Sequence, residues 1–152
     1  MIAIKKSTTA DTRTCDWSKV TREQLLESSN QHRMDVMRGM DFFRELISVR
    51  AVEHDIDKIS DIDGFHRDFQ TGFTQTEWWD NHRKIARHHI LSEDGIPEDV
   101  NLIDVLDMIT DCVMAGMGRS GSVYPLNIAP EALMKAFQNT VCLLKDQITV
   151  ED

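Results

Sequence analysis

The spacing of apolar residues is the feature that most limits what this chain can fold into. Residues 101–117 carry apolar side chains every three or four positions, at Leu102, Leu106, Ile109 and Val113. This period places them on one face of an α-helix, and no stretch shows the alternation typical of a strand. Helical spacing also covers the ranges 21–47, 47–59, 76–90 and 130–148. We therefore predict an all-α fold, a bundle of five or six helices.

Capping residues and glycines mark where these helices begin and end. Thr21 followed by Gln24 is a capping-box pattern that starts the first helix. Polar residues 28–30 then lie within it, so one long helix or two interrupted helices are both open. Residues 64–72, bracketed by glycines, are predicted to form a short loop, and residues 92–100 a connecting loop.

The composition is that of an ordinary globular chain, with 41% hydrophobic and 28% charged residues. Residues 1–20 show no period and are predicted to be a loose arm before a single helical domain over residues 21–150. No apolar run approaches the roughly 20 residues that span a bilayer, and no secretory signal is evident, so a cytoplasmic location is expected. A net charge of -9 argues against broad nucleic-acid binding.

The pair His54-Asp55 is the first candidate for chemistry, because an imidazole and a carboxylate together suit a divalent transition metal. The remaining candidate ligands are His32, His82, His88, His89 and Asp111. A His-Asp pair also arises by chance, and Asp111 can equally be a surface residue at a helix border. Asp111 nevertheless interrupts an apolar helix, where an unpaired carboxylate is costly to bury. His82 and His89 are seven residues apart, so on one helix they face the same way.

The order of these residues resembles the HD superfamily of metal-dependent phosphohydrolases. The segments that carry the resemblance are HRMDVM, HDIDK, WWDNHRKIARHH and DVLDMITDCVMA, between His32 and Ala115. Within that superfamily the chain looks like small HD-like proteins of phages and bacteria. The resemblance implies an HD-domain-like helical bundle.

What the resemblance implies for the site can be stated residue by residue. His32, His54, Asp55 and Asp111 match the four ligands that hold one metal, and His82 with His88 or His89 matches positions that hold a second. The cofactor would be one or two divalent ions, namely Fe, Mn, Co, Ni, Zn or Mg. Water on such an ion becomes a hydroxide that attacks phosphorus.

Asp55 and Lys58 are the predicted catalytic residues. Asp55 would bridge the metals or orient the water, and Lys58, the lysine of HDxxK, would contact a phosphate oxygen. The alternative for Lys58 is a solvated side chain paired with Asp57 or Asp61. Arg119, in a polar loop after the Asp111 helix, is a further candidate for substrate binding.

Several neighbouring side chains favour a structural interpretation. Trp78 and Trp79 could stack on a base, but their helical spacing makes a core position the expectation. Arg83, Lys84 and Arg87 are expected on the outer face of their helix.

These observations predict a metal-dependent phosphohydrolase acting on a nucleotide or other small phosphoester. An HD-type di-iron oxygenase is an alternative, since it uses similar ligands. A non-catalytic nucleotide- or protein-binding module of phage origin is another. A homo-oligomer is left open, because the eight methionines suit an adaptable core and a subunit interface equally well.

Overall fold

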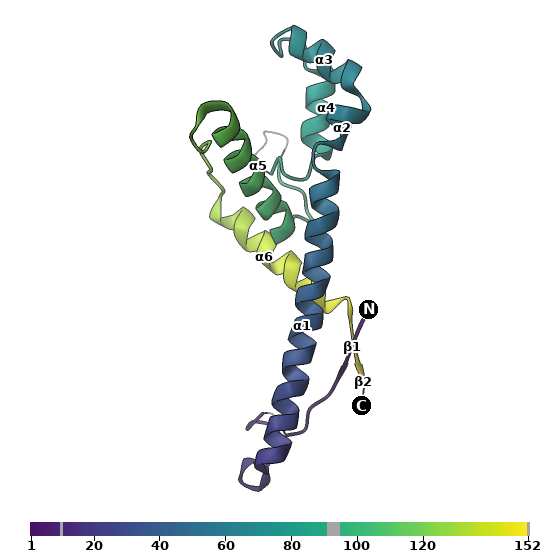
Figure 1. Ribbon diagram of the computed structural model, residues 1–152, viewed down its shortest axis with the longest axis vertical. Coiled ribbons are helices and arrows are strands. Elements are labelled where there is room, and N and C mark those ends of the chain that lie inside the picture. Colours follow the sequence, from purple (N-terminus) through teal and green to yellow (C-terminus); the bar gives the residue numbers. More distant parts are fainter. Residues whose placement is uncertain (10, 91–94, 152) are drawn as a thin grey trace. The chain divides into compact units, whose positions relative to one another are not determined.

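The computed structural model describes residues 1–9, 11–90 and 95–151, and helices dominate them (Figure 1). The helices are α1 (Arg22–Glu53), α2 (Ile56–Ser60), α3 (Ile62–Gln70), α4 (Glu77–Ile85), α5 (Leu102–Ser120) and α6 (Pro130–Lys145). A short 3-10 helix (Trp17–Lys19) and two strands, β1 (Ile2–Lys5) and β2 (Ile148–Glu151), complete the described elements. The all-α prediction is confirmed, apart from this small sheet. None of the helices so described has the length and apolar character needed to cross a membrane.

The chain divides into two compact units. The first comprises residues 1–45 and 142–152, and the second comprises residues 46–141. The single helical domain expected over residues 21–150 stays a prediction.

In the first unit, the two ends of the chain pair as parallel strands (Figure 1). Ile2 lies opposite Ile148 and Lys5 opposite Glu151. The strand β1 lies in the stretch where a loose arm is expected, and no strand is predicted from the sequence. Each strand has only four residues, which is too short for a two-residue period to stand out, and the pairing joins segments far apart in the sequence.

Helix α1 is continuous through residues 28–30. Its start is fixed as predicted, because the amide of Gln24 donates to Thr21 Oγ1 and the amide of Thr21 donates to Gln24 Oε1. The polar side chains do not break the helix, because they find local partners. The hydroxyl of Ser29 donates to the carbonyl of Leu25, at 2.8 Å, and Ser28 is buried against Thr9.

In the second unit, α5 and α6 enclose a small apolar core. Its buried members are Ile90, Val100, Val105, Met108 and Ala136. The start of α5 is fixed by a capping box between Asn101 and Asp104. The amide of Leu102 also donates to the hydroxyl of Thr140, at 2.8 Å, which ties this end of α5 to α6.

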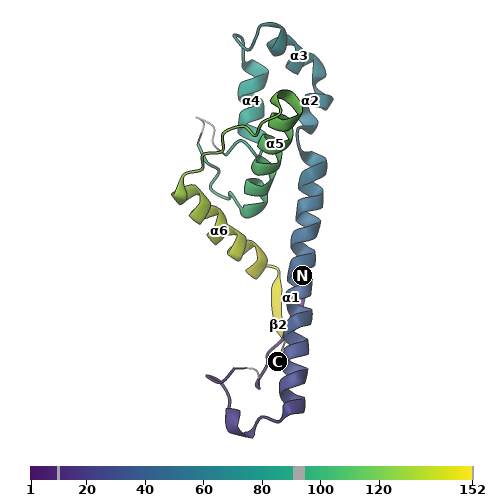
Figure 2. The same ribbon diagram turned by 60° about the vertical axis from the view of Figure 1, so that its left-hand side comes forward.

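Helices α2, α3 and α4 lie side by side in both ribbon views (Figures 1 and 2). Residues 64–72, expected to be a loop, are largely the helix α3. The glycine at its start allows close packing rather than a turn, because Gly64 is buried against the indole of Trp78. Phe65 and Trp78 also pack together, with ring centroids 4.9 Å apart. Of the connecting loop expected over 92–100, residues 92–94 lie outside the described residues.

Gly64→Ala should lower the free energy of unfolding by about 2 kcal/mol, the typical cost of overpacking a core. A methyl group there would lie 2.5 Å from Trp78 Cδ1 and would also overlap the carboxylate of Asp61. The measurement is urea denaturation followed by tryptophan fluorescence. The control is Gly118→Ala in α5, where a methyl group meets nothing within 4 Å and should be neutral or slightly stabilising. Equal stability of the two variants would contradict the close packing of α3 on α4.

Candidate metal centre

The His54-Asp55 pair lies at a break in the chain, between the end of α1 at Glu53 and the start of α2 at Ile56. The continuous helix expected over residues 47–59 is therefore wrong at this point. Asp55 adopts a left-handed backbone conformation, with φ 54° and ψ 19°. Such a conformation costs on the order of 1 kcal/mol for a residue other than glycine, and it concentrates at functional sites. The break turns the Asp55 side chain toward residues that one helix would not reach.

A second break lies before His88 and His89. The helix expected over residues 76–90 ends at Ile85, and Ala86 is extended, with φ -75° and ψ 112°. His88 and His89 therefore lie in a turn, and helical spacing does not explain how His89 meets His82. The two Nε2 atoms of His82 and His89 are nevertheless 3.1 Å apart.

The side chain of Arg87 holds this turn in place. Its guanidinium donates two hydrogen bonds to the carboxylate of Asp104, at 2.9 and 2.6 Å, and also bonds Asp99. The carboxylate of Asp104 is fully buried, and Arg50 Nη2 approaches it to 3.5 Å. The expectation that Arg87 lies on the outer face of a helix is wrong, because the helix ends before it.

The imidazoles converge on the carboxylate of Asp55. Nε2 of His54, of His82 and of His88 each lies 3.5 Å from one of its oxygens. Oδ1 of Asp55 is buried and has no hydrogen-bond partner among the described residues. A buried, unpartnered carboxylate oxygen is costly unless a cation compensates it.

Three overlapping groups of side chains have ligand atoms close enough to share one ion. They are His82, His88 and His89; His54, Asp55 and His88; and Asp55, Asp57 and His82. Nitrogen donors with one or two carboxylates fit a divalent transition metal. Since Asp55 and His88 occur in more than one group, the cluster has donors for one ion or for two neighbouring ions.

The opposite ring nitrogens of these histidines face carboxylates that sequence reasoning did not assign. His54 Nδ1 lies 2.7 Å from Asp107 Oδ1, and His82 Nδ1 lies 2.7 Å from Asp57 Oδ2. A protonated Nδ1 that donates to a carboxylate leaves Nε2 free to bind a metal. Asp107 shares a helix face with Asp111, which is the one sequence signal that could have identified it.

Burial sets the protonation of the turn histidines. Loss of solvent, together with smaller contributions from the neighbouring imidazoles, lowers the pKa of His88 to about 3 and that of His89 to about 4. Both rings are therefore neutral at neutral pH, as metal binding requires. Burial alone would raise the pKa of Asp55, but the hydrogen bond and charge of Lys58 outweigh it and hold that pKa below its usual value. Burial raises the pKa of Asp107.

Lys58 contacts Asp55 itself rather than Asp57 or Asp61. Its Nζ donates to Asp55 Oδ2 at 2.6 Å, while Oδ1 of that carboxylate faces the imidazoles of His82 and His88. The ammonium also lies 5.6 Å from the ring centroid of Trp79. Lys58 is thus a charge held at the edge of the cluster.

Two predicted site residues are exposed. His32 is exposed on α1 in the first unit, and none of the ligand groups among the described residues includes it. Arg119 is exposed near the end of α5. Its contact with substrate stays a prediction.

Asp111 lies at the edge of the cluster. Its Oδ1 is 3.7 Å from His54 Nε2, and 32% of its side chain is exposed. The sequence left open whether Asp111 lies at the surface or in the site. In the structure it is near the surface and also beside the candidate ligand His54.

The tryptophans support the cluster from one side. Trp78 is buried, as expected, and its ring stacks on His82 at a centroid distance of 5.1 Å and an interplanar angle of 10°. Trp79 is partly buried, and its amide donates to Asp68 Oδ2 at 3.0 Å. Both rings restrict the orientation of His82.

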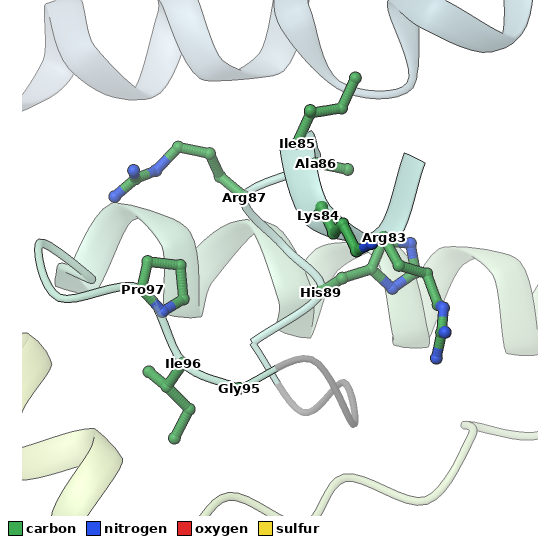
Figure 3. A pocket seen from close by; sticks show the side chains of 9 residues that line it. All are labelled: Arg83, Lys84, Ile85, Ala86, Arg87, His89, Gly95, Ile96 and Pro97. Carbon is green, nitrogen blue, oxygen red and sulfur yellow. The ribbon is translucent and has the colours of Figure 1, made fainter. Parts of the chain in front are cut away.

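A cavity of about 310 Å³ borders the cluster beside His89 (Figure 3). Arg83, Lys84 and Arg87 make its lining basic. The side chains of Arg83 and Arg87 point in different directions in this view, and they pair with Asp80 and Asp104 respectively. The two guanidinium groups therefore do not converge on one point in the cavity.

Comparisons with models of known protein families, with curated proteins and with solved structures gave no match.

Asp55→Ala should strongly weaken metal binding, because Asp55 belongs to two of the three ligand groups. Elemental analysis of protein purified without chelators should find a transition metal in the wild type and much less of it in this variant. Asp63→Ala, which removes an exposed carboxylate of α3, is the matched control and should retain the metal. A wild type that stays metal-free after incubation with several divalent ions would refute the site.

Asp107→Asn should weaken metal binding by about 10- to 100-fold, the usual effect of losing a carboxylate that orients a histidine ligand. The amide keeps the shape of the side chain but no longer fixes the proton on His54 Nδ1. Titration with a competing chelator measures the affinity. An affinity equal to that of the wild type would show that Asp107 does not orient the ligand.

Proposed function

We propose that this protein is a metal-dependent phosphohydrolase of the HD type, acting on a nucleotide or another small phosphoester. The observation that supports the proposal most is the arrangement around Asp55. Three imidazole Nε2 atoms lie 3.5 Å from its carboxylate, and Oδ1 of that carboxylate has no hydrogen-bond partner within the part of the chain that the structure describes. Asp57 and Asp107 fix the imidazoles from behind.

A bound divalent ion would lower the pKa of a coordinated water and stabilise negative charge on a phosphoryl oxygen. His54, Asp55, His82, His88 and His89 are the residues that would hold it, with Asp111 at the edge. Because these imidazoles are held by other side chains, their orientation does not have to change when a ligand arrives.

The charge of the cluster makes substrate binding dependent on the ion. Asp55, Asp57, Asp107 and Asp111 contribute carboxylates, while Lys58 contributes the ammonium that contacts one of them. A phosphate group would be repelled by this set of side chains on their own. We propose that Lys58 binds a phosphate oxygen while it remains close to Asp55, because its ammonium has three donor hydrogens and can serve both.

Lys58→Gln should reduce kcat/KM for a phosphoester by roughly 10- to 100-fold, the range expected when a hydrogen bond to a charged group is lost. Phosphate release by the Mn²⁺-loaded protein is the measurement, and the metal content of the variant should match that of the wild type. Lys84→Gln, which removes an exposed lysine of α4, is the control and should retain full activity.

The result that would overturn the phosphohydrolase proposal is metal-loaded wild type that releases no phosphate from a panel of nucleotides and small phosphoesters. Oxygen consumption by the iron-loaded protein would then favour the di-iron oxygenase. A protein with neither activity would favour the binding module.

A further inference from the structure

A second cavity, of about 290 Å³, lies against the His54 side of the metal cluster. It is formed by the last turns of α1 and by α5, all within the second unit. His54, Asp107 and Asp111 line it. A molecule in this cavity would therefore contact the same residues that face the proposed metal site.

The rest of the lining is predominantly apolar. The apolar side chains are Ile47, Ala51, Ile103, Leu106 and Met114. Ile47, Leu106 and Met114 are 44%, 46% and 67% exposed, so a ligand that covers them would remove apolar surface from water.

The polar groups of this lining have partners of their own. The hydroxyl of Thr110 donates to the carbonyl of Leu106, at 2.8 Å. Arg50 approaches Glu53 and Asp104, both at 3.5 Å, so its charge is engaged, although its Nε has no hydrogen-bond partner among the described residues. The one positive charge in the lining, that of Arg50, is thus paired with carboxylates.

We propose that this cavity holds the organic group of the substrate, and that this group is uncharged, largely apolar and about the size of one ring system. The inference rests on the proposed function and narrows its substrate class to phosphomonoesters of this kind. The volume is at the lower end of the roughly 300–1,000 Å³ found in small-molecule sites. The carboxylates on the wall and the apolar lining disfavour a second phosphate group in the cavity. The phosphate instead lies toward the imidazoles and Lys58.

The basic cavity beside His89 is less suited to bind an apolar organic group than the cavity beside His54. Its two guanidinium groups pair with Asp80 and Asp104, and its lining includes the charged side chain of Lys84. Binding of an apolar ring would be less favourable there, because charged side chains would lose their hydration on contact with it.

The test compares two alkyl phosphates that differ in their organic group. The Mn²⁺-loaded protein is assayed with benzyl phosphate and with ethyl phosphate. We expect kcat/KM to be at least about tenfold higher for benzyl phosphate, the scale on which a hydrophobic pocket discriminates. Met114→Gln should remove most of this preference. Met117→Gln is the matched control, because Met117 is also an exposed methionine of α5 but does not line the cavity.

Binding of benzylphosphonate, measured by calorimetry on the same Mn²⁺-loaded proteins, separates the two proposals. Equal kcat/KM for the two esters, unchanged by Met114→Gln, would overturn the cavity assignment and leave the phosphohydrolase intact. A third outcome is that neither ester is turned over, while benzylphosphonate still binds and Met114→Gln, but not Met117→Gln, weakens this binding. That outcome would support the assignment of the cavity and overturn phosphohydrolase activity on such esters. Neither turnover nor binding would overturn both.

Discussion

The buried ion pair between Asp104 and its two arginines is the interaction on which the site depends. Arg50, Arg87 and Asp104 each lie close in the sequence to a residue of the cluster. Arg50 precedes His54 by one helical turn, Arg87 precedes His88 directly, and Asp104 precedes Asp107 by three residues. The carboxylate of Asp104 is fully buried, so an unpaired charge there would be strongly destabilising. Satisfying it brings three segments of the chain to one place, and with them the histidines and Asp107.

A buried ion pair adds little net stability compared with apolar packing, but it can define which segments meet. That role fits the second unit, whose buried apolar core is small. The turn after α4 has no helical hydrogen bonds to hold His88 and His89. Hydrogen bonds from the guanidinium of Arg87 to Asp104 and Asp99 hold this turn in place instead.

The cluster itself combines features that oppose stability with features that favour a ligand. Asp55 has a left-handed backbone and an oxygen that no described residue hydrogen-bonds, and the Nε2 atoms of His82 and His89 lie 3.1 Å apart. Neutral imidazoles tolerate this proximity, since burial keeps the pKa of His89 at about 4. A cation among these atoms would compensate the carboxylates and use the free nitrogen lone pairs. Metal binding and the ordering of this region are therefore expected to be coupled.

The helical class, the start of α1 at its capping box, the helices α5 and α6, and the residue types of the candidate metal site could all be predicted from the sequence. These follow from patterns within a few residues, where the helical period and capping chemistry operate. The helix breaks at His54-Asp55 and after Ile85, and the contacts of Asp57 and Asp107 with the imidazoles, could not be predicted in this way and emerge from the folded chain. Those outcomes depend on contacts between residues far apart in the chain, such as His54 with Asp107 and Arg50 with Asp104, and no local pattern specifies which buried charges will meet.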